Sequence, residues 1–183
     1  MKKRNKIIEL LKTHHKILLL TIISLILFHN YIIFVVLFLI FGFIGIVSLK
    51  VTRMVPHISI ETISASAALF GYVWGWKMGL AFGLLFGFYG IYKLSFIKLK
   101  TIINVLLMGI CGIVAAIFSS LNYSFTVAFM LTFVVRMILN ITIFPLVEPD
   151  MMENIVHSFG DPLFNMLITY QFLNVIYTLL NMM

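Results

Sequence analysis

The amino-acid sequence predicts an all-α protein, a polytopic membrane bundle of six to seven transmembrane helices. Hydrophobic residues make up 62% of its 183 residues and charged residues only 10%, whereas soluble domains carry about 45–50% and about 25%. The mean hydropathy is +1.14. Because one membrane crossing needs roughly 20 apolar residues, the chain has room for six or seven crossings and for no separate aqueous domain. We therefore expect residues 1–183 to form a single transmembrane helical domain.

Apolar runs bounded by polar or turn residues mark the expected helices. His29 and Asn30 divide the first two runs, and we interpret them as a tight turn, although a single, strongly tilted helix is the alternative. Lys77 and both tryptophans separate the third run from the fourth, as is typical of an interfacial loop. The runs cover residues 17–29, 31–49, 57–72, 78–92, 101–120, 124–146 and 163–182.

The basic residues predict how the chain is oriented. Residues 1–16 are basic, and further lysines and arginines follow the second and fourth runs, at Lys50, Arg53, Lys93, Lys98 and Lys100. If seven runs cross, these segments share one side, which the positive-inside rule makes cytoplasmic. We expect an integral protein of the cell membrane with a cytoplasmic N-terminus. No small-residue cleavage site follows the first run, so we expect this segment to stay in the mature protein.

Several functional classes are disfavoured by the composition. The formal net charge of +7 lies in the loops around an apolar body, and we interpret it as membrane topology rather than a nucleic-acid footprint. A single cysteine, Cys111, excludes a disulfide framework, and no Cys/His cluster has metal-ligand spacing. Phosphate-binding loops and nucleophile motifs are also missing from the sequence. We expect neither an enzyme, nor a bound metal, nor a cofactor.

A ladder of glycines at four-residue spacing is the clearest pattern in the chain. On one helix this spacing turns each position by only about 40°, so the glycines form a smooth groove. Small residues let two helix backbones approach closely in a membrane. The groove serves either packing inside the bundle or docking of a partner subunit, for which we select Gly75, Gly79 and Gly83. The ladder consists of Gly71, Gly75, Gly79, Gly83 and Gly87, with Ala67 in phase and a second small-residue face at Gly109, Gly112, Ala115 and Ala116.

Ionisable side chains within the apolar runs are candidates for a functional site, because burying them in a membrane is costly. His57 and Glu61 are four residues apart, and so are Arg136 and Asn140, so each pair shares a helix face. We expect these four residues and Asn174 to converge on one internal polar cavity that binds substrate. The alternatives are an ion pair between Glu61 and Arg136 that only fixes the bundle, and a proton relay.

Two features near the C-terminus complete the candidate list. Tyr170, Asn174 and Tyr177 share a helix face, which suits either the wall of a small-molecule pocket or contacts between helices. The segment Glu148–Asp161 is acidic, and its spacing matches no calcium or zinc motif. We expect it to be a solvated connector.

The stretch Val55–Gly90 resembles the S components of energy-coupling-factor vitamin transporters. Pro56 matches their loop proline, and Gly71, Gly75 and Gly79 match their Gly-x-x-x-Gly turn before a glycine-rich helix. The resemblance implies a six-helix bundle that takes up a vitamin-like metabolite, with a transmembrane coupling protein and ATPases as partners in the lipid bilayer. The same stretch is similar to the rod-shape-determining MreD family, which implies a membrane scaffold without transport.

Overall fold

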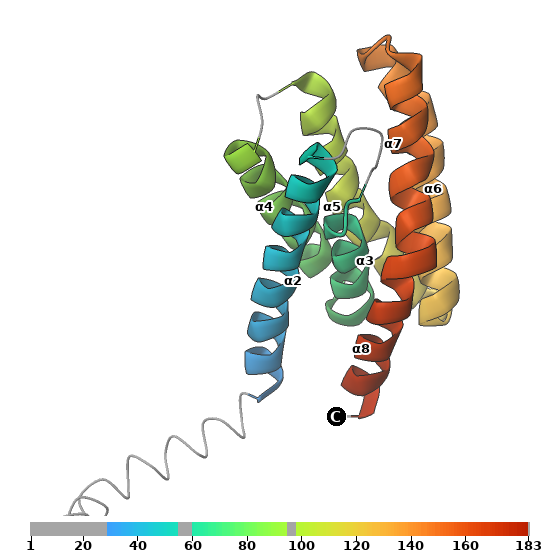
Figure 1. Cartoon of the computed structure of the whole chain (residues 1–183). Helices are drawn as coiled ribbons and strands as arrows, with labels where there is room; N and C mark the ends of the chain where they lie inside the picture. The colour runs from blue at the N-terminus through green and yellow to red at the C-terminus, as the bar shows by residue number, and fades with distance from the viewer. Residues whose placement is uncertain (1–28, 55–59, 95–97, 183) are drawn as a thin grey trace, which may run out of the picture. The chain divides into compact units, whose positions relative to one another are not determined.

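The computed structural model describes residues 29–54, 60–94 and 98–182; 92% of them are helical and none is in a strand. The all-α class is thereby confirmed. The chain divides into two compact units, Met1–Leu39 and Ile40–Met183. The described part of the first unit begins helix α2 (His29–Met54), where the Phe34 and Phe38 rings lie 5.4 Å apart. The second unit holds the rest of α2 and all later helices (Figure 1).

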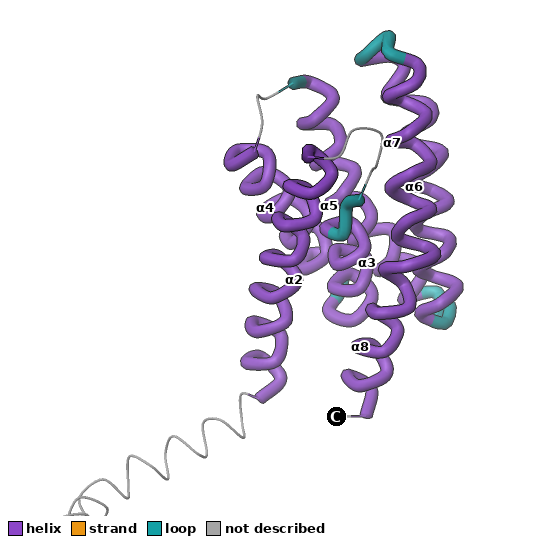
Figure 2. Tube along the Cα trace, in the orientation of Figure 1, coloured by secondary structure: helices purple, strands orange, loops and turns teal. Residues whose placement is uncertain are grey.

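The fully described connections of the second unit, such as those from α3 to α4 and from α6 to α7, are short (Figure 2). A single residue, Gly75, separates α3 from α4, and three residues separate α6 from α7. The helices are α3 (Ile63–Trp74), α4 (Trp76–Leu94), α5 (Leu99–Ser120), α6 (Phe125–Val147), α7 (Met151–Phe164), the π-helical turn η1 (Asn165–Thr169) and α8 (Tyr170–Met182). The last three elements follow one another without a break and run alongside α6.

Four of the described helices are long and apolar enough to cross a membrane: Tyr31–Thr52, Leu99–Ser120, Phe125–Val147 and Met151–Met182. They support insertion into a membrane, while six to seven crossings stay a prediction. The 12 residues of α3 give a helix of about 18 Å, too short for a hydrocarbon core of about 30 Å. His29 and Asn30 are helical, so the tight turn expected there is wrong.

The glycine ladder does not run along one helix. Gly75 interrupts it with φ +90° and ψ 166°, a backbone conformation open essentially to glycine alone. The chain therefore turns from α3 into α4 through one residue. The interfacial loop expected here is helical on both sides of Gly75, with Trp74 ending α3 and Trp76 and Lys77 beginning α4. A Cβ atom on Gly79 would lie 2.7 Å from the Gly71 Cα and 2.7 Å from the Gly112 Cα. Three helices, α3, α4 and α5, thus meet backbone to backbone.

This packing corrects the interpretation of the ladder as a partner interface. A Cβ on Gly83 would lie 2.6 Å from the backbone nitrogen of Gly109 in α5, so Gly79 and Gly83 are both covered by the same chain. Gly75, the third residue of that prediction, has no atom within 4 Å of its Cβ position and serves the turn. The ladder packs helices within the bundle, because close backbone approach is its physical role.

Helix α3 forms the centre of the second unit. All of its residues from Ile63 to Gly71 are buried, and it packs against α4, α5, α6 and α8. The Phe70 ring stacks on Phe82 of α4 at 4.7 Å. Because α3 is short and surrounded, its N-terminal end lies inside the protein, where its unpaired backbone N–H groups need acceptors.

The acidic segment Glu148–Asp161 is not a solvated connector. It contains most of α7. The Asp150 carboxylate caps the start of this helix by accepting a hydrogen bond of 3.1 Å from the Glu153 N–H, a standard N-cap. Asn154, Ser158 and Asp161 on this helix are buried. Of the four acidic residues in this segment, only Asp161 belongs to the buried face, while Asp150 and Glu153 are exposed.

Candidate functional site

A buried carboxylate closes the N-terminal end of α3. One oxygen of Glu61 accepts a hydrogen bond of 2.8 Å from the Ser64 N–H, and the other accepts one of 2.5 Å from the Ser64 hydroxyl. The positive end of the helix dipole favours a carboxylate here. Because α3 begins at Ile63, Glu61 caps the helix instead of lying on one of its faces. His57, the predicted partner of Glu61, lies outside the described residues.

Arg136 of α6 joins this carboxylate to two other helices. Its Nη1 lies 2.7 Å from Glu61 Oε2, and both side chains are almost completely buried, at 1% and 2% exposed. Its Nη2 donates to Asn104 Oδ1 of α5 at 3.2 Å and lies 3.9 Å from Asp161 Oδ2 of α7. The structure thus brings together Glu61 and Arg136, as predicted from the cost of burying either charge alone, and adds Asn104 and Asp161.

Two carboxylates face Arg136 in the described part of the cluster. Its guanidinium, which stays protonated in proteins, lies 2.7 Å from Glu61 and 3.9 Å from Asp161. Arg136 is therefore already compensated within the chain and does not need a substrate anion.

Asn165 locks the cluster at the start of the π-helical turn. Its amide Nδ2 donates to the backbone oxygen of Glu61 at 2.6 Å and to that of Asp161 at 2.9 Å. The turn begins three residues after Pro162, which has no N–H to continue the helical ladder. Single π-helical turns occur frequently at functional sites, and this one directs a fully buried amide to the residue that caps α3.

Several buried polar atoms on the helices around the cluster lack a hydrogen-bond partner among the described residues. Of the six buried side-chain atoms in the described part of the chain that have no hydrogen-bond partner, four lie on α6 and on the π-helical turn: Arg136 Nε, Asn140 Oδ1, Asn165 Oδ1 and Thr169 Oγ1. Buried polar atoms are normally paired with protein or with ordered water. Donor and acceptor atoms of this kind can hold water molecules or the polar groups of a ligand.

The other predicted site residues take different positions. Asn140 is fully buried one turn after Arg136, and its amide donates to the His157 backbone oxygen at 3.4 Å. Asn174 is nine residues beyond Asn165, or about 13 Å along the helix axis, and no contact among the described residues joins it to the cluster. Its neighbours Tyr170 and Tyr177 instead contact Phe125. These aromatic contacts therefore join α8 to the start of α6.

Three further members of the cluster were not selected from the sequence. Asn104 is a lone amide in the apolar run of α5, Asn165 is one of several polar residues in the last run, and Asp161 was assigned to the acidic connector. A polar residue in an apolar run is a signal that would have found Asn104 and Asn165. Asp161 could have been found by noting that it shares one face of a helix with Asn154 and Ser158.

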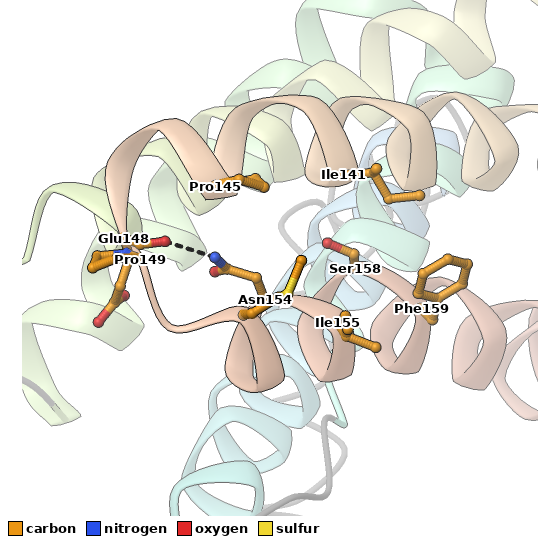
Figure 3. A pocket seen from close by; sticks show the side chains of 9 residues that line it. Ile141, Pro145, Glu148, Pro149, Asn154, Ile155, Ser158 and Phe159 are labelled. Carbon is orange, nitrogen blue, oxygen red and sulfur yellow. Dashed lines mark hydrogen bonds between the residues drawn. The ribbon is translucent and has the colours of Figure 1, made fainter.

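An open groove of about 290 Å³ lies between α6 and α7 (Figure 3). Its walls are mainly apolar. At one end the Asn154 amide donates to the Glu148 backbone oxygen at 2.7 Å, the bond drawn dashed in Figure 3. Asn154 Oδ1 is buried without a partner among the described residues. The groove is lined by Ile141, Pro145, Glu148, Pro149, Met151, Asn154, Ile155, Ser158 and Phe159.

No protein-family model, no curated protein and no solved structure matches this chain. Among the described residues, no group of three or more His, Cys, Asp or Glu side chains is arranged to hold a metal ion. The candidate site is therefore interpreted from its own geometry, as a buried network of one cation, two carboxylates and several amides.

Proposed function

We propose that this protein is a non-enzymatic integral membrane subunit that binds a small metabolite for uptake across the cell membrane. It works in the manner of the S components that Val55–Gly90 resembles, with a transmembrane coupling protein and ATPases as its partners. Its N-terminus is cytoplasmic, in accordance with the basic residues 1–16.

This proposal rests on one observation: buried polar atoms around the cluster have no hydrogen-bond partner among the described residues. A bundle that needed Arg136 and Glu61 only as a brace would be expected to pair the surrounding amides as well. Instead, Asn140 Oδ1 and Asn165 Oδ1 are buried without partners in the described part of the chain. A metabolite with hydroxyl or amine groups supplies the missing donors.

The charges specify which metabolites fit. Since Arg136 is compensated by Glu61 at 2.7 Å and approached by Asp161 at 3.9 Å, a further anion would be repelled. A neutral or cationic ligand is therefore favoured over an anionic one. Thiamine, riboflavin and biotin serve as a cationic, a neutral and an anionic probe.

The test replaces Asn140 by leucine in the full-length protein in lipid nanodiscs. Leucine has nearly the same shape without polar atoms, so it removes the unpaired buried oxygen together with the 3.4 Å bond to the His157 backbone oxygen, and the net cost in stability is about 1 kcal/mol. If that oxygen receives a ligand, Asn140→Leu abolishes the stabilisation by thiamine or riboflavin, measured as a shift of the melting temperature. The matched control is Asn174→Leu. Asn174 lies outside the cluster, so we expect this variant to keep the melting shift.

A scaffold without transport, as in the MreD family, is the second candidate. The backbone contacts of Gly79 and Gly83 with α5 favour it, because they describe a rigid bundle that has no need of a ligand. A scaffold predicts no melting shift with any of the three probes. It also predicts that Asn140→Leu changes stability without affecting uptake of the probes into cells.

A further inference from the structure

The groove between α6 and α7 opens among apolar side chains. Four of the residues that line it are exposed and apolar: Ile141, Met151, Ile155 and Phe159. Helix α6 and the continuous stretch that begins with α7 are two of the four described segments long and apolar enough to cross a membrane. In a bilayer, exposed apolar side chains on such helices contact the lipid tails. The mouth of the groove is therefore accessible to acyl chains.

The groove is too small for a helix of a partner protein. Its volume is about 290 Å³, whereas a single turn of an α-helix, about 10–12 Å wide and 5.4 Å long, already occupies more space than that. The same volume is close to the lower end of the range for small-molecule sites, about 300–1,000 Å³. A single hydrocarbon chain is narrow and flexible enough to lie between the two helices.

One wall of the groove carries a buried oxygen that needs a hydrogen-bond donor. Asn154 is only 4% exposed, and its side chain lies in the space between the two helices (Figure 3). Its Nδ2 donates to the Glu148 backbone oxygen at 2.7 Å, while its Oδ1 has no partner in the described part of the chain. Pro145, on the opposite wall, has no N–H, so the Ile141 carbonyl lacks its usual helical donor. A ligand of this groove should therefore bring donors next to its apolar chain.

Charged residues at the same end of the groove alternate in sign. The Glu148 carboxylate belongs to the lining, and Lys98 Nζ lies 3.9 Å from its Oε1. Lys98 is 69% exposed and accessible to a further anion, whereas Lys100 lies between Glu148 and Glu153 at 3.4 and 3.1 Å. A head group with one phosphate and one ammonium is complementary to a lysine next to a carboxylate, and it adds no net charge.

We propose that this groove binds a phosphatidylethanolamine molecule of the surrounding membrane. One acyl chain lies between α6 and α7, the ammonium donates to Asn154 Oδ1 beside the Glu148 carboxylate, and the phosphate pairs with Lys98. An ammonium group has three N–H donors, whereas the quaternary ammonium of phosphatidylcholine has none. Phosphatidylglycerol has hydroxyl donors but brings a net negative charge next to Glu148. The proposal does not depend on metabolite uptake.

The experiment is native mass spectrometry of the full-length protein released from lipid nanodiscs. The nanodiscs contain equal amounts of four dioleoyl lipids: phosphatidylethanolamine, its N,N-dimethyl derivative, phosphatidylcholine and phosphatidylglycerol. We expect one phosphatidylethanolamine to stay bound, with roughly tenfold preference over phosphatidylcholine, the factor that a hydrogen bond from a charged donor supplies. The dimethyl derivative keeps one N–H and should bind with intermediate strength. This series decides the question in the wild type, even if a variant does not fold.

Variants separate the contributions of the head group and of the chain. Asn154→Leu should abolish the preference for phosphatidylethanolamine over phosphatidylcholine, whereas Lys98→Gln should weaken both lipids alike, because both carry the phosphate. Ile155→Trp fills the groove and should prevent retention of either lipid. The matched control is Val127→Trp, an exposed apolar position at the opposite end of α6, which should retain the lipid as the wild type does.

Several results would overturn the proposal. It is wrong if no lipid stays bound, or if phosphatidylcholine or phosphatidylglycerol binds as well as phosphatidylethanolamine. It is also wrong if Asn154→Leu keeps the preference, if Lys98→Gln has no effect, or if Ile155→Trp and Val127→Trp behave alike. Binding of soluble phosphoethanolamine to the protein in pure phosphatidylcholine nanodiscs would show that the head group alone is recognised, and this would refute a lipid site.

Discussion

Arg136 and Glu61 are 75 residues apart in the chain and meet at 2.7 Å, with neither side chain more than 2% exposed. The contact joins the middle of α6 to the residue that caps α3. Since the Glu61 carboxylate also accepts the Ser64 N–H, the start of a central helix and the position of a transmembrane helix depend on one ion pair. Loss of either charge therefore affects both elements.

The first prediction concerns the energetics of this pair. Arg136→Leu leaves the Glu61 carboxylate buried without its cation, and we expect a loss of about 3–5 kcal/mol in the free energy of unfolding. Adding Glu61→Gln removes the stranded charge and should recover part of that loss. The free energy is measured by denaturant unfolding in detergent. Lys77→Leu, which removes an exposed cation on α4, should stay within about 0.5 kcal/mol; additive effects of the first two changes would exclude partnership.

The second prediction compares two glycines of α4. A Cβ on Gly83 meets backbone atoms of Gly109 at 2.6 and 2.7 Å, whereas a Cβ on Gly87 first meets the Val105 side chain at 2.8 Å. A side chain can rotate away, but a helix backbone must move as a whole. Gly83→Ala should therefore cost about 1–3 kcal/mol of stability and Gly87→Ala clearly less, as measured by melting temperature. Equal losses would mean that α4 and α5 are not in close contact.

The third prediction tests the one-residue turn between α3 and α4. Gly75 has φ +90° and ψ 166° with no neighbouring atom to clash with a Cβ, so any penalty at this position comes from the backbone. We expect Gly75→Ala to cost about 1–3 kcal/mol. Gly75→Asn should not rescue the protein, because asparagine favours the left-handed helical region at ψ near +47°. A rescue by asparagine, seen in thermal melts, would show that the turn has a different conformation.

The meeting of Glu61 and Arg136 could be predicted from the sequence, because the cost of an unpaired charge in a membrane does not depend on fold details. The class of the protein followed in the same way from composition. The glycine ladder shows the limit of this approach. Four-residue spacing predicts close packing correctly, but it does not reveal that Gly75 divides the ladder between two helices, nor that α5 covers it.

The acidic segment shows a different limit. The negative charge of the segment favours exposure to solvent. Its helical spacing nevertheless places Asn154, Ser158 and Asp161 on one buried face. Charged residues predict exposure only when no buried partner exists, and the partners here, Arg136 and Lys100, come from other helices. Such long-range pairing is not visible in the local sequence.

The Lys100 ammonium at the start of α5 provides the last test. Its side chain is only 10% exposed, and it lies 3.4 Å from Glu148 and 3.1 Å from Glu153. The two carboxylates are more exposed than the lysine, so water already screens part of each interaction. Lys100 is therefore the member of this group whose buried charge most needs its partners.

Neutralising both carboxylates with Glu148→Gln and Glu153→Gln should lower the free energy of unfolding by about 1–2 kcal/mol, below the range for fully buried pairs because of that screening. A solvated connector would instead show almost no loss. Adding Lys100→Met should restore most of the loss, since methionine keeps the apolar stem without the charge. Asp150→Ser, which removes a charge but keeps a capping oxygen, should leave stability unchanged. Denaturant unfolding measures all three variants, and a loss that Lys100→Met does not reverse would place the effect elsewhere than on the lysine.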